Sequence, residues 1–228
     1  MFILIKTRLV SGDYSTHSSA TTYLREVRRH REIYIHNLLG VDLTIFPDVM
    51  SPKYDPSTKF HIENMPNQNG KDFLDVGCGS GAIGLFAGLQ GATRITAVDI
   101  NPKAISCTRA NLFKHKIKNY EVFESNVFSN VRGKYDTINF AAPYHGSKPS
   151  DFLEYGVSDP NYTALRSFLK NAKHHLKDNG KILLGFSNTG DVNLLHKLID
   201  SNKLKIVERK EREQGGWVSY LYVIEPMK

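Results

Sequence analysis

The stretch Phe73–Gly84 reads FLDVGCGSGAIG, and it constrains the fold more than any other part of the sequence. Residues 73–76 are apolar enough for a short buried strand, and the apolar run from Ala82 predicts a helix. Between them lie three glycines, Gly77, Gly79 and Gly81. A strand, a tight glycine turn and a helix N-terminus together predict an edge that binds a nucleotide-like ligand.

The spacing of these glycines separates this edge from two common nucleotide sites. It is Gly-x-Gly-x-Gly rather than Gly-x-Gly-x-x-Gly, and no Lys-Ser/Thr pair closes a phosphate loop. Asp75 would repel a pyrophosphate but would suit an ammonium group. The stretch resembles motif I of the class I S-adenosylmethionine (SAM) dependent methyltransferases. The resemblance implies that the turn holds the methionine part of SAM and that Asp75 holds its ammonium region.

Length and composition set the limits of the fold. The chain has 228 residues, enough for one large α/β domain with a short extension. No apolar run approaches the ~20 residues that span a bilayer, so no membrane contact is expected. Two cysteines give no disulfide framework, which favours a reducing cytoplasm. A net charge of +7 permits nucleic-acid binding without indicating it, because the basic residues are spread along the chain.

Residues 1–69 are interpreted as an extension that covers the substrate side, and residues 70–228 as the methyltransferase core. In the extension we expect a strand over 2–10, a helix from about Ala20 to Leu39 ended by Gly40, and a strand over 43–46. The segment from Pro47 to Phe60 resembles the lead-in of the small-domain methyltransferases. That group holds ribosomal RNA guanine N2-methyltransferases and release-factor glutamine methyltransferases. The resemblance implies that this segment passes over the SAM pocket.

Asp99 ends the second predicted strand of the core, 22 residues after Gly77. A carboxylate at this point can accept hydrogen bonds from both hydroxyls of a ribose. It matches the acidic residue of the family's motif II. Farther along, Asn126 stands where the family has a residue that receives the adenine amino group; a plain turn asparagine is the competing interpretation. The residues expected to bind SAM, and its product S-adenosyl-L-homocysteine, are Asp75, Gly77, Cys78, Gly79, Gly81, Asp99, Ile100, Asn126, Val127 and Ala141.

The fourth predicted strand, over 134–140, leads into Ala141-Ala142-Pro143-Tyr144-His145-Gly146. This position falls on the family's Asn-Pro-Pro-Tyr/Phe motif. In the family, the asparagine oxygen and a proline carbonyl accept hydrogen bonds from the target NH₂, and the aromatic ring stacks on the acceptor. Here Ala141 lacks a side-chain acceptor. The candidate catalytic residues are therefore Pro143, Tyr144 and His145, the last either as a general base or as a plain loop residue.

A polar loop follows, with Asp151, Glu154 and Asp159. Its carboxylates would favour a cationic acceptor and repel phosphate. The leading hypothesis is therefore N-methylation of an amine or guanidinium on a small molecule or peptide. One alternative keeps RNA guanine N2 or a protein glutamine as acceptor, with RNA less favoured. Another is a SAM-binding partner protein without catalysis.

The remaining segments complete the predicted sheet. We expect strands over 181–186, 204–213 and 217–224, with helices over 162–176 and 191–201. The resemblance implies a Rossmann-like fold: a mostly parallel seven-stranded sheet that ends in an antiparallel hairpin. The histidines and cysteines do not fall at metal-ligand spacing, so no metal site is expected.

Overall fold

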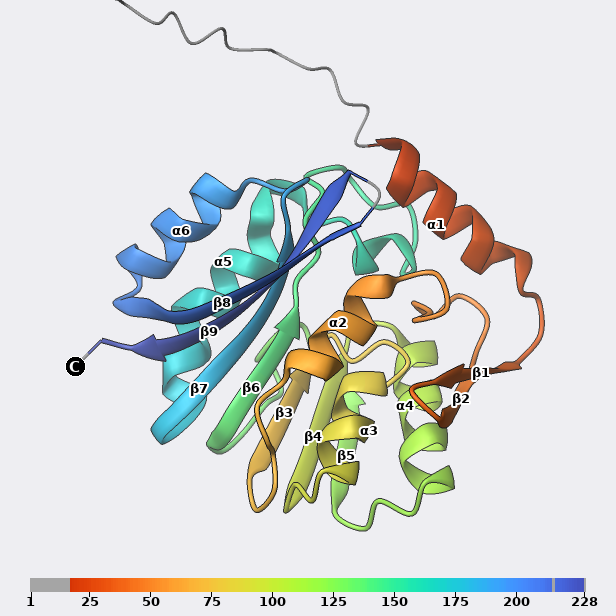
Figure 1. Ribbon diagram of the computed structural model, residues 1–228, viewed down its shortest axis with the longest axis horizontal. Coiled ribbons are helices and arrows are strands. Elements are labelled where there is room, and N and C mark those ends of the chain that lie inside the picture. The colour runs from red at the N-terminus through yellow and green to blue at the C-terminus, as the bar shows by residue number, and fades with distance from the viewer. Residues whose placement is uncertain (1–16, 215, 228) are drawn as a thin grey trace, which may run out of the picture.

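A computed structural model describes residues 17–214 and 216–227. The strand expected over 2–10 lies outside these residues. Seven strands form one sheet in the order β5-β4-β3-β6-β7-β9-β8 (Figure 1). They are β3 (Asp72–Val76), β4 (Arg94–Asp99), β5 (Tyr120–Glu124), β6 (Tyr135–Ala141), β7 (Leu176–Ser187), β8 (Leu204–Gln214) and β9 (Trp217–Pro226). Strands β3 to β7 run parallel, and β9 pairs antiparallel with both β7 and β8. The expected sheet and its closing hairpin are confirmed.

Helices cover both faces of this sheet (Figure 1). They are α2 (Pro56–Asn64), α3 (Ala82–Leu89), α4 (Pro102–Lys114), α5 (Thr163–Asn171) and α6 (Val192–Ser201). Helix α1 (His17–Arg29) packs instead against the segment around Leu153 and Val157. Short 3₁₀ turns are η1 (Glu154–Gly156), η2 (Pro160–Tyr162) and η3 (Ala172–His175). One hydrophobic core joins α5 and α6 to the sheet. The core on the opposite face joins α2, α3 and α4 to it. This double covering explains why the central strands β3, β4 and β6 are almost continuously buried.

The helix expected over 20–39 is wrong beyond residue 29. Helix α1 ends at Arg29, and β1 (Tyr34–Leu38) pairs antiparallel with β2 (Val41–Ile45). Leu39 and Gly40 both have positive φ angles, 52° and 83°, as a two-residue hairpin turn requires. The side chain of Asn37 accepts a hydrogen bond from the Gly40 N–H and donates one to Asp42. Leu38-Leu39-Gly40-Val41 is therefore a hairpin turn rather than a helix end.

Strand β7 begins five residues earlier than expected, at Leu176. Its pairing with β6 shifts register: Tyr135 pairs with Leu176, and Thr137 pairs with Lys181. Four residues of β7, 177–180, therefore lie opposite the single residue Asp136 of β6. Among them, Asn179 has a φ of 62°. The sequence Asp178-Asn179-Gly180 was expected to separate a helix from a strand. It forms a bulge inside one strand instead.

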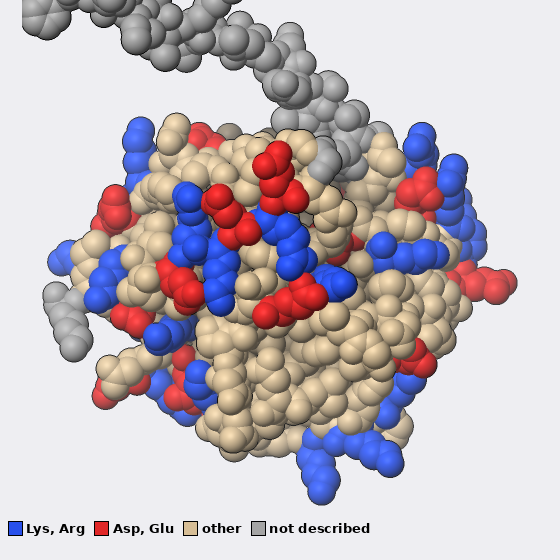
Figure 2. All heavy atoms as spheres, viewed as in Figure 1, with Lys and Arg blue, Asp and Glu red and all other residues tan. Residues whose placement is uncertain are grey.

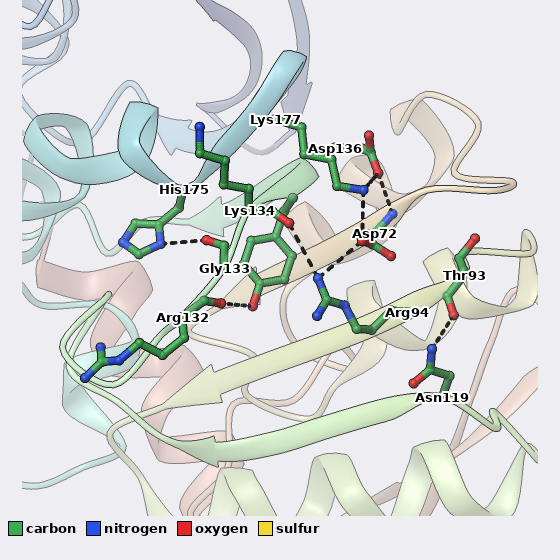
Figure 3. A network of polar contacts seen from close by, with 11 residues as sticks. Asp72, Thr93, Arg94, Asn119, Arg132, Gly133, Lys134, Asp136, His175 and Lys177 are labelled. Carbon is green, nitrogen blue, oxygen red and sulfur yellow. Dashed lines mark hydrogen bonds and ion pairs between the residues drawn. The ribbon is translucent and has the colours of Figure 1, made fainter.

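A polar network ties the strands together at their N-terminal ends (Figure 3). The Asp72 carboxylate lies 3.2 Å from Arg94 Nη2 and 2.9 Å from Lys177 Nζ. Lys177 also pairs with Asp136 at 2.8 Å, and Asp136 accepts a hydrogen bond from the Asp72 N–H. The network therefore joins β3, β4, β6 and β7 at one edge of the sheet. The opposite edge of the sheet, where these strands end, is therefore the edge available for a binding site.

The surface carries charges of both signs. On the face shown in Figure 2, Lys and Arg side chains are interspersed with Asp and Glu over the upper half. The net charge of +7 is not gathered into one basic patch on this face. Among residues 17–214 and 216–227, no helix has the length and apolarity needed to cross a bilayer.

Candidate functional site

A cavity of about 570 Å³ lies at the C-terminal ends of β3, β4, β6 and β7. The start of β9 and the segment that precedes α2 complete its wall. Within the described part of the chain, the predicted residues that line it are Gly77, Cys78, Gly79, Asp99, Ile100, Asn126, Val127, Ala141, Pro143 and Tyr144. Asp75, Gly81 and His145 are not among the lining residues.

The glycine turn forms one end of the cavity. Gly77, Gly79 and Gly81 have φ angles of 68°, 54° and 78°, which L side chains rarely adopt. A Cβ on Gly81 would also lie 2.8 Å from the methyl group of Thr108. Gly81 thus lets the turn pack against α4, while Gly77 and Gly79 face the cavity.

Helix α3 begins at this turn without a side-chain cap on its N-terminus. Its first residues, Ala82 and Ile83, line the cavity. The first N–H groups of a helix have no partners within the helix and carry a partial positive charge. A carboxylate placed here would be stabilised.

Asp75 lies beneath the turn rather than in the cavity. Its side chain is 1% exposed. One carboxylate oxygen accepts a hydrogen bond from the Gly84 N–H at 3.0 Å, and the other accepts one from Asn139 Nδ2 at 2.8 Å. Burial raises the pKa of Asp75 to about 7. The observed contacts support the turn and α3; direct contact with an ammonium group stays a prediction.

Asp99 holds the loop that follows β4. Its two carboxylate oxygens accept hydrogen bonds from the N–H groups of Gly79 and Asn101, both at 2.9 Å. Burial raises the pKa of Asp99, while these backbone donors act in the opposite direction. Asp99 lines the cavity beside Ile100, in the position that suits a ribose.

Asn126 and Val127 follow the end of β5 and line the cavity. Asn126 is exposed, and its backbone N–H donates to Ser129 Oγ at 3.1 Å. Val127 is buried with a φ of 52°. Phe128 stacks on His175 with ring centroids 4.6 Å apart. Ile100, Asn126 and Val127 all line the cavity, and their contact with adenine stays a prediction.

The loop after β6 forms the acceptor side of the cavity. Ala141 pairs with Gly185 of β7, and the Ala142 N–H donates to the Gly185 carbonyl at 3.1 Å. Pro143 is buried and Tyr144 is half-buried, and both line the cavity. Burial raises the pKa of Tyr144, so its hydroxyl stays protonated at neutral pH.

His145 has a position fixed by its backbone. Its N–H donates to the Val157 carbonyl at 2.9 Å, and its carbonyl accepts from the Asp159 N–H at 2.7 Å. These contacts hold the loop 142–146 against the segment before η2. A general-base role for His145 stays a prediction.

The carboxylates of the acidic loop all have partners within the protein. Asp151 and Glu154 pair with Arg28 of α1 at 2.7 and 2.9 Å. Asp159 is 4% exposed, and its carboxylate accepts hydrogen bonds from the Ala164 and Leu165 N–H groups at the start of α5. The carboxylates that suggested a cationic acceptor therefore have structural partners.

Several lining residues come from the segment before β3, which sequence reasoning placed only in outline. The Tyr23 hydroxyl accepts a hydrogen bond from the Ser51 N–H at 2.8 Å. The Asp55 carboxylate caps α2 by accepting from the Ser57 N–H at 2.9 Å. His61 of α2 also lines the cavity and is 3% exposed. His61 gave no sequence signal, because a single polar residue on a helix is most often a surface or core residue.

The cavity can be tested for fit to SAM. It offers an uncapped helix N-terminus for a carboxylate, a turn with three glycines that admits a close ligand, and the Asp99 carboxylate, which is expected to bind a ribose. Among the described residues, no cluster of histidine, cysteine or acidic side chains could hold a metal ion. These features of the cavity fit SAM.

Comparison with known proteins gives the family. The model of the methyltransferase small domain matches residues 42–208. The chain therefore belongs to the small-domain methyltransferases, as the sequence motifs had indicated.

Relatives in this family carry two kinds of name. The chain is 31% identical to a provisionally named protein N5-glutamine methyltransferase of Methanocaldococcus jannaschii, over 70% of this chain and 83% of that protein. It is 30% identical to ribosomal RNA small subunit methyltransferase C of Psychromonas ingrahamii, over 65% of this chain but 41% of that protein. The chain thus spans about two fifths of the length of this second relative.

Solved structures show the same fold. A methyltransferase of Pyrococcus furiosus has a TM-score of 0.62 at 19% identity, with 94% of this chain and all of that chain covered. The T. thermophilus 16S rRNA N2 G1207 methyltransferase, solved with AdoMet and guanosine, has a TM-score of 0.62 at 18% identity. That match covers 86% of this chain and 50% of the other.

Proposed function

We propose that this protein transfers the methyl group of SAM to the side-chain amide nitrogen of a glutamine in a protein. The observation that carries the proposal is the lining of the cavity. It has several aromatic side chains, among them Tyr23, Tyr144 and Phe186, and no lysine or arginine among its described lining residues. A flat, uncharged acceptor fits such walls better than a phosphate-bearing one.

The acidic residues of the lining agree with an uncharged acceptor. They are Asp55, Asp99 and Asp159. Each accepts at least one hydrogen bond from a backbone N–H at a turn or helix start. Every carboxylate in the lining is therefore already hydrogen-bonded to the backbone, and none is left solely to bind a cationic amine or guanidinium. Methylation of an amine or guanidinium on a small molecule or peptide remains an untested prediction, and the acidic loop that suggested it no longer supports it.

The family relatives favour the same acceptor. The glutamine methyltransferase relative is matched over most of its length, whereas the ribosomal RNA relative has more than half of its length outside the match. Guanine N2 on RNA remains the alternative acceptor, since an aromatic wall also suits a base.

The residues of this chain position the acceptor. SAM supplies an electrophilic methyl group: the new N–C bond forms as the S–C bond breaks, and the nitrogen loses a proton to water. Tyr144 provides an aromatic surface, and backbone carbonyls of the 141–143 segment can accept hydrogen bonds from the amide NH₂. Holding the nitrogen in line with the methyl group supplies most of the acceleration.

The test uses methyl-labelled SAM and cell extract separated into protein, RNA and small-molecule fractions. Labelled protein is hydrolysed in strong acid, which frees methylamine from N5-methylglutamine but leaves methyl-lysine and methyl-arginine intact. The proposal expects label in protein and labelled methylamine after hydrolysis. Label in RNA would support the guanine alternative. Label in small molecules would restore the amine hypothesis, and SAM binding without transfer would indicate a non-catalytic partner.

A further inference from the structure

His61 lies beside the position where the family asparagine is missing. Its ring rests over Gly185, the residue of β7 that pairs with Ala141. A Cβ on Gly185 would lie 3.1 Å from His61 Nδ1 and 3.3 Å from the Cα of Ala141. The Nδ1 atom and Ala141 therefore flank the same point at the acceptor end of the cavity. A glycine at 185 is what admits the imidazole here.

A buried chain of polar side chains leads to this ring. Asp75, Asn139 and His61 come from β3, β6 and α2, on one face of the sheet. With Asp75 ionised, Asn139 donates from Nδ2 to its carboxylate at 2.8 Å, and this contact fixes the orientation of the amide. Its oxygen then points away from Asp75 as a hydrogen-bond acceptor.

The imidazole tautomer follows from that orientation. Asn139 Oδ1 and His61 Nε2 are both buried, and neither has another partner at hydrogen-bond geometry. Asn139 acts to raise the pKa of His61, as an acceptor beside a ring N–H does. The two atoms complement each other when Nε2–H donates to Oδ1. The lone pair of the neutral ring then lies on Nδ1.

Burial keeps this ring neutral. It lowers the pKa of His61 to about 4, so the imidazole is neutral near pH 7 and carries a single N–H. In the tautomer with that proton on Nε2, Nδ1 is free to accept a hydrogen bond. The group is accordingly a hydrogen-bond acceptor and a very weak base. It can orient an N–H group but cannot remove its proton efficiently.

We propose that His61 Nδ1 accepts a hydrogen bond from the NH₂ of the methyl acceptor, in place of the oxygen that the family asparagine supplies. The Asp75–Asn139 pair acts as a positioning unit, because it fixes the tautomer of the ring. The inference rests on the proposed function for the identity of the acceptor. It explains how a methyltransferase with Ala141 retains a directed side-chain acceptor at its active centre.

Substitutions at His61 separate the two ring nitrogens. In His61→Asn, the amide oxygen takes the place of Nδ1, whereas in His61→Gln the amide lies near the place of Nε2. We expect His61→Asn to retain most of the kcat/KM, and His61→Gln and His61→Leu to lose about 10- to 100-fold, as for a lost hydrogen bond in a buried site. SAM affinity should stay within about threefold of wild type in all three. His196→Leu, on α6 beside Tyr222 and outside the cavity, is the matched control.

A rescue variant guards against a purely structural effect. Ala141→Asn restores the family acceptor, so it should recover activity in the His61→Leu background. Equal kcat/KM in wild type, His61→Leu and His61→Gln would overturn the proposal. So would a failure of Ala141→Asn to rescue His61→Leu while SAM binding is intact.

A spectroscopic readout is independent of turnover. In protein labelled with ¹⁵N-histidine, the His61 signals are those lost in His61→Leu. We expect a neutral ring with a protonated Nε2, and a shift of the Nδ1 signal when a glutamine-containing peptide is added with S-adenosyl-L-homocysteine. A protonated Nδ1, or an Nδ1 signal that the bound peptide leaves unchanged, overturns the inference. An enzyme that methylates no amide but shows the expected tautomer and shift would contradict only the proposed function.

Discussion

Replacing Gly81 with alanine tests how the glycine turn is held. Gly81 has a φ of 78°, which costs an alanine about 1–2 kcal/mol. The new Cβ would lie 2.8 Å from Thr108 Cγ2 and 3.0 Å from Thr108 Cα, so α4 or the turn must move. Overpacking of this kind costs about 1–3 kcal/mol. The expected loss in the free energy of unfolding is the sum, about 2–5 kcal/mol.

Displacement of Thr108 in Gly81→Ala should also lower the affinity for SAM. Thr108 donates hydrogen bonds to the Gly79 carbonyl at 3.1 Å and to Cys78 Sγ at 3.2 Å, so moving it disturbs the cavity edge. Gly133→Ala is the matched control, because Gly133 has a φ of 83° but nothing within 4 Å of its Cβ position. Urea unfolding and calorimetric titration with SAM measure the two effects. Gly81→Ala that is no less stable than Gly133→Ala, with full SAM affinity, would refute the reasoning.

Three further substitutions extend the account. Asp99→Asn should lower SAM affinity about tenfold or more in calorimetry, because its two oxygens accept backbone N–H groups and one would be replaced by an NH₂. Arg28→Ala should lower the free energy of unfolding by about 0.5–1 kcal/mol at pH 7. Arg28 holds the pKa of Glu154 at about 2, below its unfolded value, so this difference should narrow as urea unfolding is measured from pH 5 down toward pH 3. Tyr144→Ala should reduce kcat/KM about tenfold with unchanged SAM affinity, whereas Tyr144→Phe keeps the ring and should stay near wild type.

The parts of the fold that follow from local patterns were predictable from the sequence. Helix α3 and strand β4 have the expected bounds, because a glycine turn and a terminal aspartate mark their ends. The hairpin at Leu39-Gly40 was missed, because Tyr34 and Leu38 also satisfy helical spacing. Its two-residue turn outweighs that weak periodicity.

The candidate site was predictable where the chain itself brings residues together. The turn and the strand ends meet at one edge in any sheet of this kind, so Gly77, Asp99 and Tyr144 were found. His61 was missed because its role depends on α2 packing over Gly185, a contact between residues more than 120 positions apart. The acidic loop misled for a similar reason, since Arg28, the partner of Asp151 and Glu154, lies far away in the sequence.

A crystal structure with S-adenosyl-L-homocysteine tests the central claim most directly. The account predicts that the product binds in the described cavity, with its carboxylate at the start of α3 and its ribose at Asp99. Its sulfur should face the 141–144 segment, so that a methyl group on it would point toward Tyr144 and His61. Density at another place, or an empty cavity at saturating concentration, would contradict the account.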